Sequence, residues 1–311
     1  MTTALITSPD AERHLTPAGH PERPERMQAL HAALAARDFD TLMRVEAPMG
    51  REDDVLRCHA PSHLARIKAA IPAQGVVALD ADTHVSPASL QVGLRGVGGA
   101  AHALQLVLGG EVANAFVATR PPGHHAERDR TMGFCLFGNA AIAARLALDV
   151  HGLSRVAIMD FDVHHGNGTQ DLLWDEERIR FASTHQMPLW PGTGAASETG
   201  AAGNIRNVPL PPGADGAQFR TEMEREVLPW LDGFAPELVI ISAGFDAHHA
   251  DPLAQLAFEV DDFVWATHRL CDIADAHADG RVVSTLEGGY DLDALAASAA
   301  AHLTVLMERG A

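Results

Sequence analysis

Acidic and histidine side chains that could hold a metal ion are spaced two residues apart at Asp160, Asp162 and His164. They begin at the end of an apolar run that predicts a buried strand, and side chains on alternate positions of a strand share one face. Two carboxylates and an imidazole packed together there would be costly to bury unless a cation held them. Each aspartate alone is better explained by a turn or a helix cap, and the histidine alone by an exposed loop position. The clustering favours a metal site, to which Asp246 could add a further ligand.

Three protein ligands with one open position are typical of catalytic zinc, which polarises a carbonyl group and lowers the pKa of bound water. On the hard–soft scale of metal ligands, two aspartates and one histidine form a harder set than three histidines. Fe2+ and Co2+ are therefore alternative occupants.

Other side chains suited to acid–base chemistry directly follow segments rich in proline and glycine. His124 and His125 come directly after Pro-Pro-Gly, and an imidazole beside a metal site is a natural general base and acid. Tyr290, the only tyrosine, follows Gly-Gly, and its hydroxyl could stabilise a developing oxyanion. Surface polarity is the alternative for the histidines, and an ordinary amphipathic role is the alternative for the tyrosine.

These residues need a scaffold that brings them together. Short apolar, β-rich runs predict strands at 115–119, 156–161, 179–183, 238–242 and 282–286, and Ala/Leu-rich stretches predict helices at 139–150, 217–231, 261–278 and 292–307. The alternation predicts a single α/β domain over residues 1–311, with a mostly parallel central sheet and helices on both faces. The chemical groups follow the carboxyl ends of the predicted strands, where such sheets carry their sites.

Composition excludes several classes of protein. With 23 Lys+Arg against 41 Asp+Glu, the net charge is −18, and Lys68 is the only lysine, so we expect no nucleic-acid partner. Cys58, Cys135 and Cys271 form no disulfide or metal-knuckle pattern. We find neither a signal peptide nor an apolar run long enough for a membrane span, and we therefore expect a soluble, cytoplasmic protein.

Five motifs are similar to those of one known family, and they occur in that family's order. They are Arg-Pro-Pro-Gly-His-His-Ala (120–126), Gly-Phe-Cys (133–135), Asp-Val-His-His-Gly-Asn-Gly-Thr (162–169), Pro-Gly-Thr-Gly (191–194) and Ala-Gly-Phe-Asp (243–246). The chain resembles zinc-dependent histone deacetylases, including class II-like bacterial amidohydrolases and acetylpolyamine amidohydrolases, within the arginase–deacetylase superfamily. The resemblance runs from His20 to Tyr290. It implies a three-layer arginase/deacetylase-like fold and hydrolysis of an acylated amine.

The resemblance also implies two cation sites. Zinc would bind Asp162, His164 and Asp246. A structural potassium ion would bind at a second set of positions: Asp160, Asp162, His164, Ser183 and Thr184.

The resemblance also implies a role in the reaction for several residues. His125 would deprotonate the zinc-bound water and later protonate the amine, while His124 would give electrostatic support. Asp160 would orient His124, and Asn167 would lie behind His125, where a neutral partner leaves it less basic than a carboxylate would. Tyr290 would bind the oxyanion.

The substrate would thread a tunnel between Phe134 and Trp190, where relatives usually carry phenylalanine in place of the tryptophan. Gly133 would offer its carbonyl to the substrate amide, and Leu253 stands where polyamine deacetylases tend to have an acidic gatekeeper. Further positions implied at the substrate or product site are Gly288, Asp82, which would bond the substrate backbone, and Arg26, beside the acetate-release cavity.

Three alternatives remain open at this point. An acetylpolyamine or other small N-acyl amine deacetylase is disfavoured by the neutral Leu253, although the acidic surface would attract any polycation. An arginase-like ureohydrolase would need carboxylates where Gly166 and His248 stand. A silent acyl-lysine reader would normally have lost a ligand, a catalytic histidine or the tyrosine, and all are present.

Overall fold

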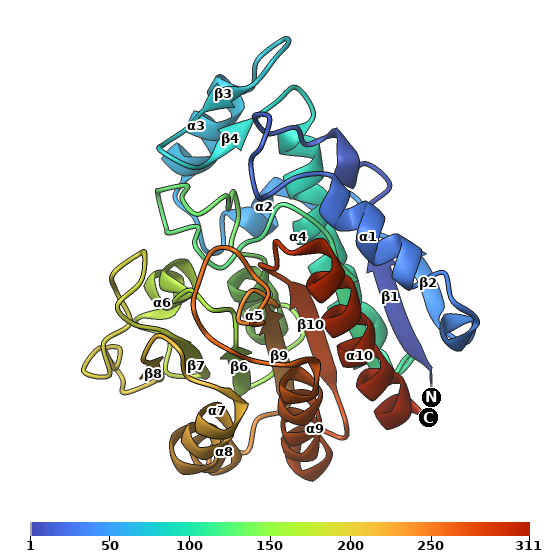
Figure 1. The fold of residues 1–311 in the computed structure, drawn as a ribbon, viewed down its shortest axis with the longest axis vertical. Coiled ribbons are helices and arrows are strands. Elements are labelled where there is room, and N and C mark those ends of the chain that lie inside the picture. The colour runs from blue at the N-terminus through green and yellow to red at the C-terminus, as the bar shows by residue number, and fades with distance from the viewer. Residues whose placement is uncertain (1) are drawn as a thin grey trace.

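A parallel sheet forms the centre of the computed structural model, which describes residues 2–311 (Figure 1). Within these residues the sheet has eight strands in the spatial order β2-β1-β5-β10-β9-β6-β7-β8, and each neighbouring pair is parallel. The strands are β1 (Thr3–Thr7), β2 (Met43–Glu46), β5 (Asn114–Ala118), β6 (Val156–Asp160), β7 (Ile179–Gln186), β8 (Ile205–Leu210), β9 (Leu238–Ala243) and β10 (Val282–Leu286). A separate antiparallel hairpin consists of β3 (Val77–Ala78) and β4 (His84–Val85).

Helices cover both faces of the sheet (Figure 1). One face carries α1 (Glu25–Ala33), α7 (Gly216–Glu222), α8 (Leu228–Asp232), α9 (Val260–His277) and α10 (Leu292–Gly310). The other face carries α2 (Glu52–Val55), α3 (Pro61–Ala70), α4 (Ser89–Leu108), α5 (Asn139–Asp149) and α6 (Asn167–Leu173). Among residues 2–311, no helix is long and apolar enough to cross a membrane.

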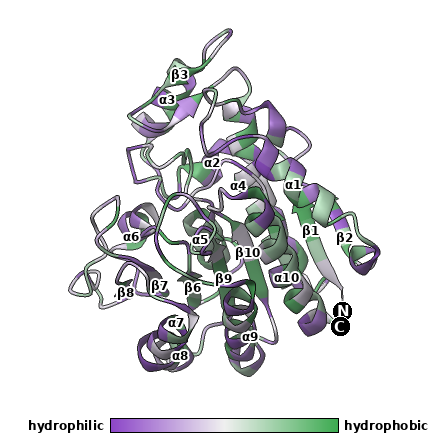
Figure 2. Cartoon of the chain, viewed as in Figure 1, coloured by the Kyte–Doolittle hydropathy of each residue, from purple (hydrophilic) through white to green (hydrophobic). Residues whose placement is uncertain are grey.

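The strands are apolar throughout because both of their faces are buried. In β6, Ala157 and Met159 pack with the core under α9 and α10, whereas Val156 and Ile158 pack with the core under α4 and α5. Figure 2 shows the hydrophobic colour concentrated in the central strands, with hydrophilic segments on the outer helices. The predicted α/β architecture is confirmed.

Several predicted boundaries differ from the structure, three of them by more than a shift at one helix or strand end or with a consequence for the site. The predicted helix 217–231 is divided into α7, a π-helical turn at Met223–Val227 and α8, because Pro229 lacks the N–H that a continuous helix would need. Strand β7 continues to Gln186, and β6 ends at Asp160. Asp162 and His164 therefore follow the strand, and strand alternation is the wrong explanation for their position.

Candidate metal and catalytic site

The five strands predicted from the sequence are neighbours at the centre of the sheet, β5-β10-β9-β6-β7. Their carboxyl ends are level: Asp160 pairs in register with Ser242 of β9 and with Ser183 of β7, and Leu286 of β10 pairs with Ala243. The segments that follow these strands consequently converge at one edge, where they carry the candidate metal and catalytic residues.

Asp162, His164 and Asp246 form one compact group of potential metal ligands. Their ligand atoms all lie within 4.8 Å of one another. His164 Nδ1 is 3.3 Å from Asp162 Oδ1 and 3.2 Å from Asp246 Oδ2. The tight loop after β6 creates this arrangement, because the Asp162 N–H donates to Asp160 Oδ1 and the His164 N–H donates to Asp162 Oδ1. Such local bonds from backbone to aspartate stabilise turns.

The group has the charge and donor chemistry that fit a divalent cation. All three side chains are buried, and burial together with the charge of Asp162 raises the pKa of Asp246 to about 7. Burial opposes the charged form of His164, but its hydrogen bonds to Asp162 and Asp246 raise its pKa to about 10. The two carboxylates thus draw positive charge to the point where the three side chains meet. Two oxygen donors and one imidazole suit zinc or a neighbouring transition metal.

Gly288 closes this group from the β10 side. Its N–H donates to Asp162 Oδ2 at 2.8 Å. A Cβ atom at this position would lie 2.2 Å from Asp246 Oδ2 and 2.6 Å from Asp162 Oδ2. Only glycine lets the backbone pass this close to both carboxylates. Gly288 therefore contacts the metal group, whereas the sequence predicted a substrate contact.

His124 and His125 lie side by side but have different partners. His124 Nδ1 is 2.9 Å from Asp160 Oδ2, and His125 Nδ1 donates to Asn167 Oδ1 at 2.7 Å. Glu127 fixes the orientation of the amide by accepting from Asn167 Nδ2 at 2.7 Å. Since Nδ1 of His125 carries the hydrogen, its Nε2 is the acceptor nitrogen.

The two imidazoles consequently differ in basicity. Burial disfavours the charged form of His124, but the charges of Asp162 and Asp160 outweigh it and raise the pKa well above 6.5. Burial lowers the pKa of His125 well below 6.5, and the positive charge of His124 adds to this effect. One histidine is therefore suited to hold a proton and the other to accept one.

Tyr290 is held from behind by Arg26. Burial raises the pKa of the Tyr290 hydroxyl well above 10, so it remains a hydrogen-bond donor. The Arg26 guanidinium lies 5.0 Å from the centre of the tyrosine ring. Its Nε and Nη2 donate to the carbonyl oxygens of Gly289 and Glu287 at 2.7 and 2.6 Å. Arg26 thus fixes the backbone that carries Tyr290.

A cavity of about 180 Å³ leads to the group. The predicted wall residues Phe134, Trp190 and Leu253 all line it, together with Asp82, His125, Gly133, His164, Leu189 and Tyr290. The Trp190 ring stands edge-on to His125, with 4.7 Å between the ring centres.

The cavity wall at Gly133 and Phe134 depends on a tight backbone. Gly133 has a φ of 56°, and a Cβ there would lie 2.3 Å from the His125 ring. The Gly133 N–H donates to Asp82 Oδ1 at 3.0 Å, and the Phe134 N–H donates to Thr83 Oγ1 at 3.1 Å. Asp82 therefore supports the wall, in addition to lining the cavity where a substrate would bind.

The positions expected to hold potassium lie on β6, on the loop after it and on β7. Asp160 and Ser183 are register partners, and Thr184 Oγ1 is buried without a hydrogen-bond partner among the described residues. Ser183 Oγ is 2.9 Å from His185 Nδ1. Carboxylate and hydroxyl oxygens are suitable donors for a hard cation.

Two buried carboxylates that sequence reasoning missed hold the loops of the site. Glu287 accepts from the Gly123 and His124 N–H groups at 2.6 and 3.1 Å and from Ser242 Oγ at 2.8 Å. Asp251 accepts from backbone N–H groups at 2.7 to 3.2 Å: those of Leu253, Tyr290 and Asp291. Glu287 directly follows a predicted strand, which was a usable signal, whereas the loop position of Asp251 gave none.

The fold and the site define a known class of protein. Residues 20–306 match the model of the histone deacetylase domain, and the chain belongs to this family of deacetylases and amidohydrolases.

Particular relatives agree with this membership. The chain is 40% identical over 278 residues to a histone deacetylase-like amidohydrolase of Pseudomonas aeruginosa, covering 88% of this chain and 73% of that one. It is 35% identical over 299 residues to a probable deacetylase of Archaeoglobus fulgidus, covering 94% and 82%. The crystal structure of the HDA15 HD domain superposes with a TM-score of 0.92 at 33% identity, covering 99% of this chain and 89% of that one.

Proposed function

We propose that this chain is a metal-dependent deacylase that hydrolyses the amide bond of acylated amines, above all acyl-lysine side chains. The observation that carries the proposal is the 180 Å³ cavity, whose polar lining includes His125, His164 and Tyr290; we call these three residues its floor. A narrow cavity with apolar walls and a polar floor suits an extended alkyl chain that ends in an amide.

The metal would be held by Asp162, His164 and Asp246, with Zn2+ as the expected ion and Fe2+ or Co2+ as alternatives. When bound, such an ion supplies Lewis acidity and lowers the pKa of water. K+ at the set around Asp160 and Ser183 would be structural.

The side chains of this protein would carry the proton transfers. His125 Nε2 accepts a proton from the attacking water and delivers it to the leaving nitrogen as the C–N bond breaks. His124, held by Asp160, stabilises the negative charge of the transition state, and the Tyr290 hydroxyl donates to the amide oxygen. The products are a carboxylic acid and a free amine.

The cavity wall supports acyl-lysine as the substrate class. Phe134 and Trp190 would flank the alkyl chain, the Gly133 carbonyl would accept the substrate N–H, and Asp82 would bond the substrate backbone. A polyamine carries further ammonium groups, and Leu253 offers them no charge. Small N-acyl amines are therefore the second candidate.

A panel of substrates tests the proposal. Purified enzyme of measured metal content is assayed with acetyl-lysine peptides, longer acyl-lysine peptides and acetylated polyamines. We expect the acetyl-lysine peptides to be hydrolysed fastest. Asp246→Ala should lose the tightly held metal together with activity, whereas the surface change Asp232→Ala should lose neither. Full deacylation by Asp246→Ala with no metal bound would refute the proposal.

A further inference from the structure

A second group of candidate metal ligands lies outside the cavity. His248, His249 and Glu259 each offer a ligand atom, and these atoms lie within 4.8 Å of one another. The histidines belong to the loop after β9, and Glu259 immediately precedes α9. We propose that these three residues bind one divalent transition-metal ion, with zinc as the best match, at a site separate from Asp162, His164 and Asp246.

The geometry combines one anchored and two accessible ligands. His248 is 8% exposed, whereas the His249 and Glu259 side chains are 52% and 65% exposed. His249 Nδ1 lies 3.1 Å from Glu259 Oε1, and the two imidazole centres are 4.5 Å apart. An ion can thus reach the group from solvent, while two of its ligands are already adjacent.

Two existing interactions are affected: the Glu259 side chain caps the first turn of α9 together with Asp262, and His248 accepts one hydrogen bond. The Ala250 N–H donates to His248 Nδ1 at 3.2 Å. Ala250 is exposed, so water can take over this amide when His248 turns a nitrogen toward the ion. The free-energy cost of this exchange is small, because replacing a protein hydrogen bond by one to water changes the net free energy little.

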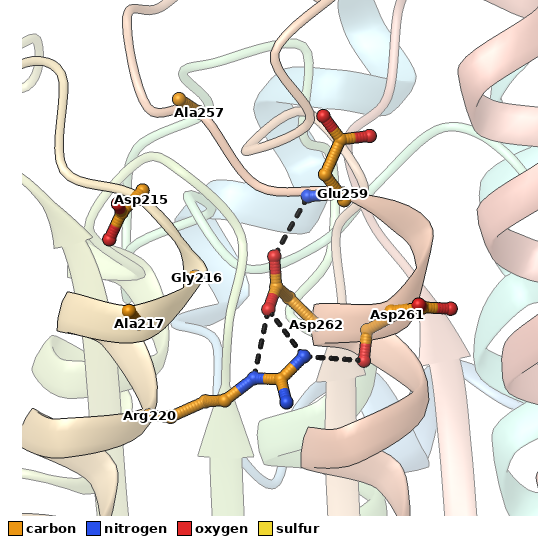
Figure 3. Close-up of a pocket in the computed structure, with 8 residues that line it drawn as sticks. All are labelled: Asp215, Gly216, Ala217, Arg220, Ala257, Glu259, Asp261 and Asp262. Carbon is orange, nitrogen blue, oxygen red and sulfur yellow. Dashed lines mark hydrogen bonds and ion pairs between the residues drawn. The ribbon is translucent and has the colours of Figure 1, made fainter.

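The local charge favours a cation. Glu259 borders a surface hollow of about 520 Å³ that also contains Asp215, Asp261 and Asp262. Arg220 in this hollow donates to Asp262 at 2.8 Å, and the Glu259 carboxylate points away from that ion pair (Figure 3). The negative potential of Glu259 and its acidic neighbours attracts positive ions.

The donor set selects the kind of ion. Two imidazoles and one carboxylate are the ligands that zinc takes in many open, three-ligand sites. Mg2+ and Ca2+ prefer oxygen donors alone. Without an ion, the exposed pair of His249 and Glu259 contributes little to stability. This pair alone does not explain why His248 lies beside it.

An ion here would join the two ends of one loop. The His249 N–H donates to the Phe258 carbonyl at 2.9 Å, and the Phe258 N–H donates to the Ala247 carbonyl at 3.1 Å. The loop between these bonds carries Leu253, which lines the cavity. Zinc at the second site would therefore restrain the segment that forms one wall of the cavity.

Calorimetric titration with zinc chloride tests the proposal on the full chain. We expect the wild-type protein to bind one zinc ion per chain that His249→Ala does not bind, and Glu259→Gln should bind this ion more weakly or lose it. His277→Ala is the matched control, because His277 forms a surface pair with Asp232 at 2.8 Å. It should keep the full stoichiometry. Magnesium chloride should give no corresponding binding.

A second readout follows the loop itself. Zinc should slow hydrogen exchange at the His249 and Phe258 amides in the wild type and leave it unchanged in His249→Ala. The proposal is wrong if His249→Ala retains the wild-type zinc stoichiometry, or if His277→Ala loses the same ion. Both readouts measure binding alone, so they are independent of whether the chain hydrolyses acyl-lysine.

Discussion

The proton chemistry of the site depends on the partners of two adjacent histidines. His124 faces the Asp160 carboxylate, whereas His125 faces the Asn167 amide. A carboxylate stabilises an imidazolium ion, and a neutral amide does so much less. The same buried surroundings thus give two imidazoles opposite preferences for the proton. Burial is the main cause of the lowered pKa of His125, followed by the charge of His124, whereas the hydrogen bond to Asn167 acts in the opposite direction.

Removing the Tyr290 hydroxyl should affect the reaction and spare the metal. We expect Tyr290→Phe to lower kcat by about 10²- to 10³-fold, as loss of an oxyanion donor does. Metal content and thermal stability should be unchanged, because the ring keeps its contacts with Phe134 and Arg26. Steady-state kinetics with metal analysis checks this. An unaltered kcat would remove Tyr290 from the mechanism.

Placing a charge at Leu253 should change substrate preference. We expect Leu253→Glu to raise the kcat/KM ratio of acetylated polyamines to acetyl-lysine peptides by about tenfold, equivalent to about 1.4 kcal/mol. The new carboxylate would pair with a polyamine ammonium group at the cavity wall. Leu253→Gln, which has nearly the same shape without the charge, is the control. Equal ratios in the two variants would contradict a gatekeeper role.

The sequence predicted the five central strands of the sheet and missed the outer strands β1, β2 and β8. The five central strands are continuous apolar runs, whereas β2 at one edge of the sheet is largely exposed. Helix α4 was missed because Gly93, Gly96, Gly98 and Gly99 are poor helix formers. These glycines allow close packing: a Cβ on Gly98 would lie 2.1 Å from the Pro48 carbonyl oxygen. Tertiary contacts, which no local pattern reveals, determine that helix.

Most of the candidate site could be predicted because its residues follow the central strands. Asp251 could not be predicted, since its role depends on how two loops meet. Its carboxylate joins the Leu253 loop to the backbone of Tyr290 and Asp291, and Asp291 is the N-cap of α10. The carboxylate therefore ties the cavity wall to the segment between β10 and α10.

Weakening the hydrogen bonds of Asp251 should affect both the Leu253 loop and the segment that carries Tyr290. We expect Asp251→Asn to lower the free energy of unfolding by about 1 to 3 kcal/mol, because an amide has only one acceptor oxygen for three N–H donors. The kcat should also fall at unchanged metal content, since Tyr290 loses its backbone support. Chemical denaturation and kinetics test this expectation. Asp293→Asn, an exposed change on α10, is the control. Wild-type kcat in Asp251→Asn would show that Tyr290 needs no such support.

Over the whole molecule, many of the 18 histidines are buried structural groups. His302 on α10 is an example: Nδ1 lies 2.7 Å from Thr267 Oγ1, and Nε2 lies 2.9 Å from Ser284 Oγ. Thr267 donates its own hydrogen to the Phe263 carbonyl, so Nδ1 of His302 must be the donor to Thr267. Burial lowers the pKa of His302 to about 3, and burial is also the main reason that His59 and His165 have a pKa of about 3.

These buried imidazoles should make the fold sensitive to acid. Below about pH 6.5 the unfolded chain binds protons that the folded chain excludes, so stability is lost as the pH falls. Each such group should contribute about 1.4 kcal/mol per pH unit between about pH 6.5 and 3. His302→Gln should be less stable than the wild type near neutral pH but show a shallower loss on acidification. Urea denaturation over this range tests it, and equal slopes in the two proteins would contradict the prediction.

The floor and the walls of the cavity come from separate parts of the chain. The floor residues follow the central strands, which are buried on both faces, whereas the walls at Phe134, Trp190 and Leu253 come from three different loops. Trp190 is 41% exposed, and its replacement need not disturb the sheet. Selectivity can therefore change during evolution while the metal ligands are retained. A mutant library confined to Trp190 and Leu253 would explore new acyl and amine preferences while leaving Asp162, His164 and Asp246 in place.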